Sequence, residues 1–237
     1  MWQNFVDVHQ HVLFGVDDGP DSEEKMYEML KDAAWDGIGV LVATPHITPG
    51  VRKFPIEQYW KALDMAEEYI RTHHLKIRLY KGAEILYTEQ TCQHLLEGKA
   101  PTMAGTDRVL VEFSPDVRYE KIHEAVESLN GNGFVPILAH VERYRELFTK
   151  QSRMESLKKE YQVYYQMNCA TIAQRALFHQ RKYIQTALDE GMIDVLGTDA
   201  HNRSNRRTMM TEAWRALRRG YGDRYANRLV SGWVLTA

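Results

Sequence analysis

The feature that most constrains the fold is a regular alternation of short apolar segments with amphipathic ones. Seven apolar runs have the composition of buried strands: residues 4–8, 38–43, 77–81, 108–111, 135–139, 163–167 and 193–196. Segments with helical periodicity lie between and after them: residues 22–36, 56–72, 89–97, 119–130, 146–160 and 181–190, with further helical segments toward the end. Strands that alternate with helices pair in parallel, and their nearly continuous apolar character indicates that both faces are covered. The sequence therefore predicts a parallel α/β fold.

Two parallel architectures fit this alternation, a closed barrel and an open doubly wound sheet. The open sheet usually carries a glycine-rich loop for a nucleotide, and the sequence has no such loop. We therefore expect a distorted (β/α)7 TIM-like barrel, irregular because seven strands rather than eight are visible. No stretch has the composition of a linker, so residues 1–237 are expected to form a single domain.

Residue types that bind metal ions follow most of these strands. His9 and His11 come at the end of the first strand, and residues two apart in an extended chain point the same way. The later strands are followed by further histidines and carboxylates: His46, Glu84, Glu112, His140, Asp199 and His201. The carboxyl ends of parallel barrel strands lie on one face, so these side chains are expected to converge. One histidine alone is more often structural, but five of the ten histidines occupy these positions, and the whole set favours a metal centre.

The number of these groups indicates how many ions the centre holds. With Asp18 added, the five histidines and four carboxylates exceed what a single ion can bind. Two or three divalent ions that share bridging carboxylates account for the set. Mixed imidazole and carboxylate ligands suit manganese, iron or zinc, and no thiolate lies at these positions.

The bulk properties narrow the classes of function. The formal net charge is −2, so no binding of nucleic acid or of an anionic membrane is expected. No apolar run reaches the length of a membrane span, and the first residues do not have the pattern of a signal peptide. Two cysteines cannot build a disulfide framework, which fits a reducing compartment. We therefore expect a cytoplasmic protein.

The order of the motifs resembles a known superfamily. These motifs are Asp-x-His-x-His, Val-Asp-Asp-Gly-Pro, Thr-Pro-His, Gly-Ala-Glu, Glu-Phe-Ser, Ala-His-Val-Glu-Arg-Tyr and Asp-Ala-His-Asn. Together they look like the polymerase-and-histidinol-phosphatase (PHP) superfamily. More narrowly, Val16-Asp17-Asp18-Gly19-Pro20 with His140-Val141-Glu142-Arg143-Tyr144 is similar to the bacterial manganese-dependent tyrosine phosphatases of capsule and exopolysaccharide operons. The resemblance runs from Asp7 to about Arg206, nearly the whole chain.

The resemblance implies a (β/α)7 barrel and a trinuclear site at the strand ends. By motif position, the first metal would be held by His9, His11, Glu84 and Asp199. Glu84 would bridge to a second metal, shared with Glu112 and His140. The third metal would be held by Asp18, His46 and His201. The same comparison favours Asp18 over Asp17 as a ligand and makes Asp7 a structural support for the histidines.

Arg143 and Arg206 complete the expected site, and with Asp199 they are the predicted catalytic residues. Arg143 lies three residues past His140, and Arg206 lies five past His201, so both belong to loops on the ligand face. A guanidinium offers a planar fork for phosphate oxygens and stays charged at any working pH. An arbitrary loop arginine is usually just solvated, but the resemblance places both at phosphate-clamping positions.

The expected reaction is hydrolysis of a phosphate monoester by metal-activated hydroxide. The substrate implied by the resemblance is phosphotyrosine in a bacterial tyrosine kinase that controls capsular or exopolysaccharide synthesis. Three alternatives stay open: a small-molecule phosphatase such as histidinol phosphatase, a nuclease-like phosphodiesterase, and a metal-binding regulatory module without turnover. The sequence leaves the oligomeric state open.

A second phosphatase signature is present but misleading. Cys169 and Arg175 have the Cys-x5-Arg spacing of thiol-dependent tyrosine phosphatases. Those enzymes need a glycine-rich loop whose amides cradle the phosphate, and this segment has no glycine. We expect a chance match, with the neighbouring Asn168 at a strand end and facing the metal site.

Overall fold

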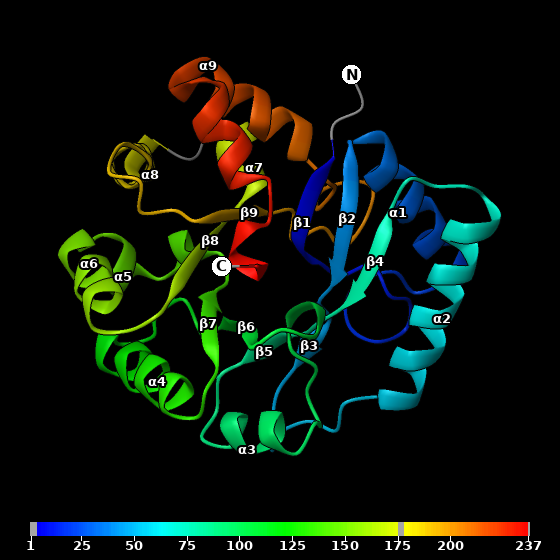
Figure 1. Cartoon of the computed structure of the whole chain (residues 1–237), viewed down its shortest axis with the longest axis horizontal. Coiled ribbons are helices and arrows are strands. Elements are labelled where there is room, and N and C mark those ends of the chain that lie inside the picture. The colour runs from blue at the N-terminus through cyan, green and yellow to red at the C-terminus, as the bar shows by residue number, and fades with distance from the viewer. Residues whose placement is uncertain (1–3, 175–177, 237) are drawn as a thin grey trace.

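The computed structural model describes residues 4–174 and 178–236, where parallel strands alternate with helices (Figure 1). The strands of these residues are β1 (Phe5–Gln10), β2 (Ile38–Ala43), β3 (His46–Ile47), β4 (Arg78–Lys81), β5 (Glu84–Leu86), β6 (Arg108–Glu112), β7 (Val135–Leu138), β8 (Tyr164–Asn168) and β9 (Val195–Gly197). The helices are α1 (Glu23–Trp35), α2 (Ile56–Thr72), α3 (Thr91–Leu96), α4 (Tyr119–Gly131), α5 (Arg145–Phe148), α6 (Gln151–Glu160), α7 (Cys169–Ala173), α8 (Phe178–Asp189) and α9 (Met210–Leu229). The short 3₁₀ turns are η1 (Met103–Gly105), η2 (Val141–Arg143) and η3 (Trp233–Leu235).

The strands form a curled parallel sheet. They are hydrogen-bonded in the orders β1-β2-β4 and β3-β5-β6-β7-β8-β9. Only two residues separate β2 from β3, and only two separate β4 from β5, so each pair continues the same path after a bend. At the other side, the Asp199 amide donates to the His9 carbonyl (2.7 Å) and the His11 amide donates to the Ala200 carbonyl (2.9 Å). The first and last strands are therefore neighbours at their carboxyl ends.

The predicted parallel α/β alternation is confirmed, while several boundaries differ. Strand β1 reaches Gln10, two residues beyond the predicted end, because Gln10 pairs with both Ala43 and Ala200. The second strand is interrupted at Pro45, which has no amide hydrogen to donate to a neighbouring strand. The predicted helix over 146–160 is divided into α5 and α6, and the one-turn helix α7 was not predicted.

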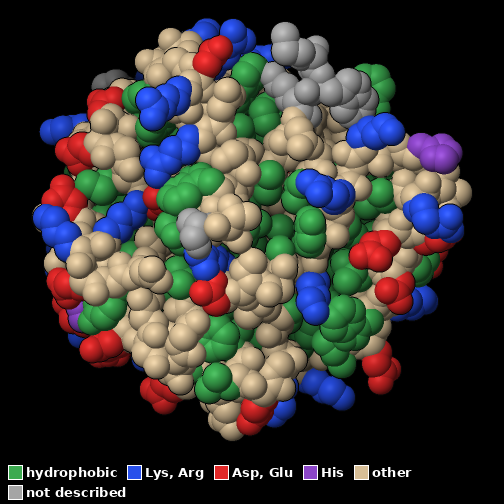
Figure 2. Space-filling model, viewed as in Figure 1, with side chains coloured by type: hydrophobic (Ala, Val, Ile, Leu, Met, Phe, Trp, Pro, Cys, Tyr) green, Lys and Arg blue, Asp and Glu red, His purple; other side chains and the backbone are tan. Residues whose placement is uncertain are grey.

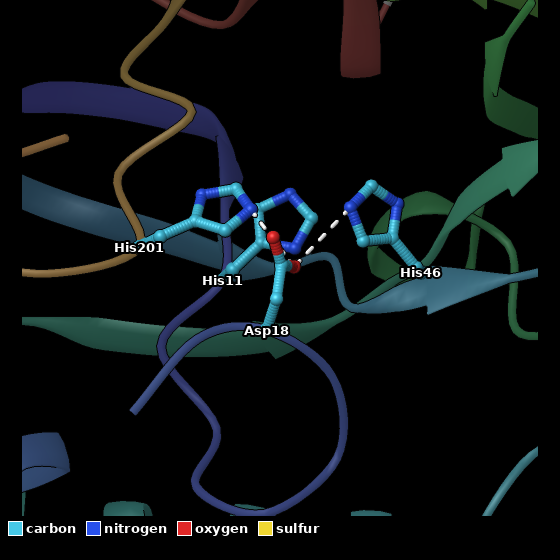
Figure 3. Close-up of side chains that lie close together, drawn as sticks. All are labelled: His11, Asp18, His46 and His201. Carbon is cyan, nitrogen blue, oxygen red and sulfur yellow. Dashed lines mark ion pairs between the residues drawn. The ribbon is translucent and has the colours of Figure 1, made fainter. Parts of the chain in front are cut away.

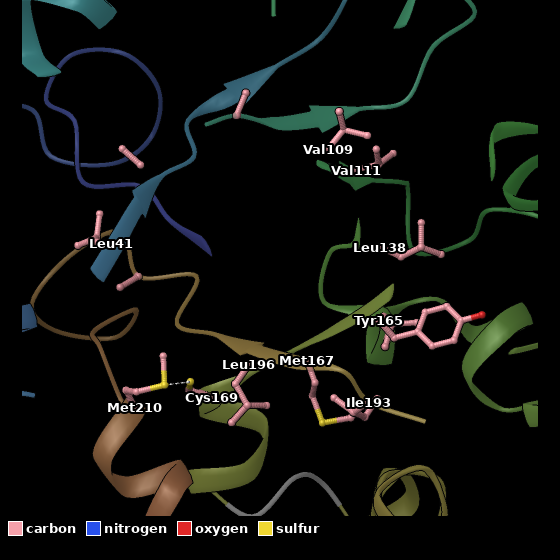
Figure 4. Packing of buried hydrophobic residues seen from close by; sticks show 14 of the residues in the cluster. Leu41, Val109, Val111, Leu138, Tyr165, Met167, Cys169, Ile193, Leu196 and Met210 are labelled. Atoms are coloured by element: carbon pink, nitrogen blue, oxygen red, sulfur yellow. Dashed lines mark hydrogen bonds between the residues drawn. The ribbon is translucent and has the colours of Figure 1, made fainter. Parts of the chain in front are cut away.

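Apolar side chains pack on both sides of the sheet. The helices surround the strands (Figure 1), and the larger cluster fills the space between the two layers. Figure 4 shows part of it, including Leu41, Val111, Tyr165 and Leu196. A smaller cluster on the opposite side draws on strands and two 3₁₀ turns: Val8, Val42, Met103, Leu110, Ile137, Ala139, Val195 and Val234. Alternate residues of one strand thus face the helices and the interior of the curl.

The C-terminal turn η3 covers one end of this interior. Val234 is fully buried in the smaller cluster. The Arg108 guanidinium donates to the Val234 carbonyl (3.0 Å), and the Trp233 indole donates to the Asp194 carbonyl (2.8 Å). Arg108 begins β6 and Asp194 directly precedes β9. The turn therefore lies at the amino ends of the strands, opposite the predicted ligands.

The exterior is polar and carries charges of both signs. On the face drawn in Figure 2, basic and acidic side chains are interspersed with apolar ones. None of the helices in the described residues combines the length and the hydropathy needed to cross a bilayer.

Candidate metal centre

All nine predicted ligands lie on one side of the sheet, at the carboxyl ends of β1, β2, β4, β6, β7 and β9 or in the segments that follow them. His9 is inside the extended β1 and His11 directly follows it, while His46 begins β3 and Glu84 begins β5. Glu112 ends β6, and three further ligands follow the next strands: His140, Asp199 and His201. Asp18 comes from the loop after β1. It is 59% exposed, whereas most of the other members are buried, so the centre opens to solvent at Asp18.

The deepest group consists of His9, His11, Glu84 and Asp199, all buried. The Nε2 atoms of His9 and His11 are 3.1 Å apart, and each lies 3.2 Å from Oε2 of Glu84. Oδ1 of Asp199 lies 3.6 Å from both nitrogens. One ligand atom from each residue thus faces a common point, an arrangement that can hold a divalent ion.

A second group lies at the solvent side and contains His11, Asp18, His46 and His201 (Figure 3). Oδ1 of Asp18 is 3.2 Å from Nε2 of His201 and 3.4 Å from Nε2 of His46. The rings of His11 and His201 stack with their centroids 3.7 Å apart. This group contains the predicted trio and adds His11 to it.

A third group joins His46, Glu84 and Glu112. Nδ1 of His46 lies 3.1 Å from Oε2 of Glu84 and 3.0 Å from Oε1 of Glu112. Nε2 of His140 is 2.7 Å from Oε1 of Glu84 and 3.8 Å from Oε2 of Glu112. Glu84 therefore lies at the middle of the site, as expected for a bridging carboxylate. His46 belongs to two of the groups, because its Nε2 faces Asp18 and its Nδ1 faces Glu84.

Buried polar atoms without hydrogen-bond partners indicate that these groups fit a cation. Among the described residues, such atoms include Nδ1 of His46, Oε2 of Glu84 and Nε2 of His201. A buried polar atom without a partner is costly. All three atoms point into the groups just described, so a bound divalent ion would satisfy them. The donor set therefore fits a metal ion.

Two of the histidines are held by hydrogen bonds on the ring nitrogen that faces away from the centre. Nδ1 of His11 lies 2.6 Å from Oδ2 of Asp17, and Nδ1 of His9 lies 3.0 Å from Oε1 of Gln166. A proton on each Nδ1 leaves the Nε2 lone pair free to face an ion. Asp17 also accepts from the His46 amide (3.0 Å), so it supports the loop and the ring together.

Gln166 connects several parts of the site. Its Oε1 accepts from the His140 amide (2.7 Å) as well as from His9, and its Nε2 donates to Oδ1 of Asn168 (2.9 Å). Asn168 in turn donates to Oδ2 of Asp199 (2.8 Å), so it faces the site as expected. The Gln166 amide therefore links the His9 ring, the backbone after β7 and the Asn168 side chain, and through Asn168 it reaches Asp199.

Asp7 supports the same strand ends from behind. Its carboxylate accepts from the amides of His9 (3.2 Å) and Thr198 (2.9 Å) and from the Thr198 hydroxyl (2.6 Å). Burial raises the pKa of Asp7 to about 6, although the bonds from Thr198 and His9 oppose the change. The structural role expected for Asp7 is confirmed.

Two of the predicted ligands have left-handed backbone conformations. The φ angles are +32° at His140 and +52° at Asp199, and neither residue is glycine. Such conformations cost free energy and persist where the surrounding structure imposes them, often at functional sites. Here they turn the chain sharply after β7 and β9 and direct both side chains toward Glu84.

The charges within the cluster shift the pKa values of its members. Burial lowers the pKa of His11, but the hydrogen bonds and charges of Asp17 and Glu84 outweigh it and raise the pKa to about 10. Burial raises the pKa of Glu84, but the charge of His9 and bonds from His11 and His140 hold it well below its ordinary value. Burial and the positive charges of His11 and Arg206 lower the pKa of His201 to about 4. The lowered pKa of Glu84 keeps this central carboxylate ionised and able to bind cations.

Both predicted arginines lie at the mouth of the site. Arg143 donates to Oδ2 of Asp199 (2.6 Å), and Arg206 donates to Oδ1 of the same carboxylate (2.9 Å). Arg206 also reaches Oδ2 of Asp18 (3.3 Å). The two guanidiniums are partly exposed. An anion that enters the centre from solvent can therefore contact both of them, next to the exposed Asp18 loop.

Cys169 lies in a different environment. It is fully buried at the start of α7, and its thiol donates to Sδ of Met210 (3.6 Å; Figure 4). Burial raises the pKa of this thiol well above its ordinary value, so it is not a ready nucleophile. Arg175, the other end of the Cys-x5-Arg spacing, lies outside the described residues.

With this geometry in hand, comparison with known proteins identifies the family. A family model described as capsular polysaccharide synthesis, CpsB/CapC, matches residues 5–232. The chain belongs to the CpsB/CapC family. The narrower resemblance expected from the motifs is thereby confirmed.

Curated relatives of this CpsB/CapC protein align over most of its length. Tyrosine-protein phosphatase CpsB of Streptococcus agalactiae serotype III (strain NEM316) is 28% identical over 229 residues, which cover 94% of each chain. Tyrosine-protein phosphatase YwqE of Bacillus subtilis (strain 168) is 25% identical over 218 residues, covering 92% of this chain and 85% of YwqE.

A solved structure from the same family has the same fold. It comes from work on YwqE of Bacillus subtilis and CpsB of Streptococcus pneumoniae, described as unique metal-dependent tyrosine phosphatases. The TM-score is 0.85 at 24% identity, and the match covers 94% of this CpsB/CapC chain and 90% of the other.

Sequence reasoning missed the residues that hold the ligands of this CpsB/CapC centre. The sequence predicts no role for Gln166 or Thr198. It brings in Asp17 only as a possible ligand, less favoured than Asp18. One signal for Gln166 was present: it is a polar residue between Tyr165 and Met167, which both face the helices. Alternation along β8 then points Gln166 into the site.

Proposed function

We propose that this CpsB/CapC protein is a metal-dependent protein tyrosine phosphatase. The observation that carries the proposal is the convergence of five imidazoles, four carboxylates and two arginines at one end of the sheet. The relatives named tyrosine-protein phosphatases support the same activity, since their alignments span nearly the whole chain. A metal-binding module without turnover would not need two guanidiniums beside the ligands.

The cofactor that fits the donor set is two or three divalent ions. We propose that these ions are manganese. Iron and zinc are alternatives, because they also bind mixed imidazole and carboxylate ligands. The proposed ligands fall into three groups that share Glu84, His11 or His46: His9, His11, Glu84 and Asp199; Glu84, Glu112, His140 and His46; and Asp18, His46, His201 and His11. When bound, such ions lower the pKa of a water molecule that attacks the phosphorus and neutralise charge on the phosphoryl oxygens.

The two arginines are the proposed phosphate clamp. Each guanidinium can donate two parallel hydrogen bonds to phosphoryl oxygens, and each keeps its charge throughout the reaction. Asp199 accepts one hydrogen bond from each arginine, so it orients both donors. We therefore include Arg143, Arg206 and Asp199 among the catalytic residues. Donors fixed in advance stabilise the negative charge that develops in the transition state.

The proposed substrate is phosphotyrosine in a protein. The phenolate leaving group is a good one, so a dedicated general acid is not required. We infer a bacterial tyrosine kinase that controls capsular or exopolysaccharide synthesis as the physiological substrate, because the family takes its description from capsular polysaccharide synthesis. Such a kinase substrate would place the reaction in the cytoplasm.

The architecture proposed for the enzyme is a distorted (β/α)7 barrel that forms one phosphatase domain over residues 1–237. If β2 with β3, and β4 with β5, each count as one strand, the described strands reduce to seven. The backbone bonds between the ends of β1 and β9 support a closed arrangement. Continuous apolar packing along the chain supports a single domain.

An assay with four substrates tests the proposed function. The purified chain is loaded with Mn²⁺ and given a phosphotyrosine peptide, p-nitrophenyl phosphate, histidinol phosphate and a phosphodiester. We expect rapid hydrolysis of the two aryl phosphates, its loss with a chelator and its return with Mn²⁺.

The Cys169→Ser variant separates this mechanism from thiol chemistry. We expect it to keep most of the activity, because the thiol is buried against Met210. Activity that survives complete removal of metal, or that disappears in Cys169→Ser protein with ions bound and folding intact, contradicts the proposal.

A further inference from the structure

Two cavities adjoin the centre on opposite sides of the exposed Asp18. One, of about 170 Å³, is bounded by Asp18, His46 and the loop over residues 47–55. The other, of about 460 Å³, is bounded by Asp18, His201 and residues of α1 and the loop after β9. A peptide whose phosphate enters the centre would therefore pass over one or both cavities with its neighbouring residues.

The two cavities differ in their free charge. In the larger one, the cations are already paired: Lys25 with Asp21 (2.7 Å), and Arg203 with Glu28 (2.9 Å). The smaller one is bordered by Arg52 and Lys53, both exposed. Neither forms an ion pair or a side-chain hydrogen bond with any residue of 4–174 or 178–236. Of the two cavities, only the smaller one is therefore bordered by exposed cations without an ion pair, and it also contains Asp17 and Asp18.

The loop that carries these cations is held in place at its base. The Thr88 hydroxyl donates to the Pro49 carbonyl (3.0 Å), and the amide of Arg52 donates to the Thr48 carbonyl (3.2 Å). Gly50 has a φ of +72°, and a Cβ there would run into the Gln90 side chain. The ring of Phe54 packs against Tyr59 with centroids 5.4 Å apart. The backbone is therefore fixed, while the long side chains of Arg52 and Lys53 can reach a ligand.

We propose that Arg52 and Lys53 form an anion subsite that binds a carboxylate side chain, Asp or Glu, close to the phosphotyrosine of the substrate. The inference rests on the proposed phosphatase function. In the proposed mechanism Arg143 and Arg206, oriented by Asp199, bind the phosphoryl group, whereas Arg52 and Lys53 select the segment around the phosphotyrosine. An ion pair between either cation and a substrate carboxylate is exposed to solvent. Its contribution to binding is therefore small and is weakened by salt.

The test compares peptides and variants of the metal-loaded full chain. Three phosphotyrosine peptides of equal length carry Glu, Gln or Lys on both sides of the phosphotyrosine. We expect kcat/KM of the wild-type protein to be roughly 3- to 10-fold higher for the Glu peptide than for the Gln peptide, mostly through KM. The ratio should fall toward 1 in Arg52→Gln/Lys53→Gln protein and in high salt. Arg52→Glu/Lys53→Glu protein should instead prefer the Lys peptide.

Matched controls separate the subsite from the centre. Arg219→Gln/Arg224→Gln removes two exposed cations of α9 that likewise form no ion pair with the described residues, and it should leave the ratio unchanged. Hydrolysis of p-nitrophenyl phosphate, which has no flanking residues, should be the same in all variants. An unchanged peptide ratio with normal p-nitrophenyl phosphate hydrolysis overturns the subsite alone. If the metal-loaded wild type hydrolyses neither compound, the phosphatase function is overturned and the subsite with it.

Discussion

Gln166 illustrates how strongly the candidate ligands depend on a side chain behind them. Its amide oxygen accepts from the ring of His9 and from the backbone of His140, and its amide nitrogen donates to Asn168. These bonds set which nitrogen of His9 is protonated, so they decide whether Nε2 offers a lone pair to an ion. Gln166 is therefore a positioning residue for the metal centre.

Replacing Gln166 with leucine should weaken metal binding. Leucine has a similar volume but neither accepts nor donates, so His9 loses the bond that orients its ring. We expect the affinity for Mn²⁺ to fall about 10- to 100-fold, measured by competition with a chelating dye. Gln185→Leu is the control, because Gln185 bonds to Asp189 and Tyr221 on an exposed helix face. Equal affinities in the two folded variants would refute this role.

Asp7→Asn should change how stability depends on pH. The pKa of Asp7 rises from an ordinary value of 3.8 to about 6 in the folded protein because of burial. The unfolded chain releases this proton at lower pH, so the stabilisation is fully present below pH 3.8 and is lost as pH rises through about 6. The size of this loss is roughly 3 kcal/mol. Asparagine does not titrate, and it can still accept both amide hydrogens and bond to Thr198.

Urea unfolding at several pH values checks the Asp7 prediction. The free energy of unfolding of the wild type minus that of Asp7→Asn should decline between pH 4 and 6, and the subtraction removes the titration of the histidines. Asp64→Asn, an exposed site on α2, should show a constant difference. A constant difference for Asp7→Asn as well would show that Asp7 is not held protonated by burial.

At this scale the sequence points to candidate ligands more readily than to the residues that support them. His46, Glu84 and Glu112 could be found because each follows an apolar run, where an unpaired charge would be costly. Thr198 bonds to Asp7 across 191 residues, and Gln166 bonds to His9 across 157. Partners so far apart leave no local pattern, since either residue alone has many possible roles.

Strand β9 approaches β1 closely because Gly197 has no side chain. A Cβ at this position would lie 2.6 Å from Cβ of His9 and 3.1 Å from Nε2 of Gln166. Gly197→Ala should therefore destabilise the protein by roughly 1–3 kcal/mol in urea unfolding and displace His9.

Gly220→Ala provides the contrast for this prediction. Gly220 lies in α9, and nothing stands within 4 Å of an added Cβ. Alanine favours the helix there, so stability should rise by about 0.5–1 kcal/mol. Equal effects of the two substitutions would contradict the proposed close approach at β9.

Among the elements, long amphipathic helices and apolar strands were predictable and short pieces were not. Helix α2 was expected over the residues it occupies, because its buried residues recur with helical spacing. Strands β3 and β5 are two and three residues long, and they exist because their neighbours in the sheet supply hydrogen bonds. Such pairing is a tertiary effect that no local propensity encodes.

For the molecule as a whole, metal binding and folding should be linked. The centre concentrates buried histidines and carboxylates that are paired with one another, and several of their atoms have no hydrogen-bond partner. An ion that binds only the folded chain stabilises it by about 2.7 kcal/mol when its free concentration is a hundred times its Kd. We expect Tm to rise with Mn²⁺ concentration and to fall on chelation.

Proton release accompanies this linkage. The pKa of His11 is about 10 when no ion is bound, so an ion that takes its Nε2 must displace a proton. The stabilisation by Mn²⁺ should therefore shrink as pH falls. Glu84→Gln protein, which lacks the central carboxylate, should respond only weakly. A Tm that is independent of Mn²⁺ in the wild type would contradict the linkage.

The bond between the Asp199 amide and the His9 carbonyl has a consequence for biosynthesis. A ribosome releases the chain from its N-terminus, so His9 and His11 emerge well before Asp199 and Arg206. A nascent chain that stops short of residue 199 holds the first histidines without the aspartate that completes their group. Such a chain should be inert at any ion concentration. Hydrolysis should thus begin only after the chain has been synthesised past Asp199 and Arg206.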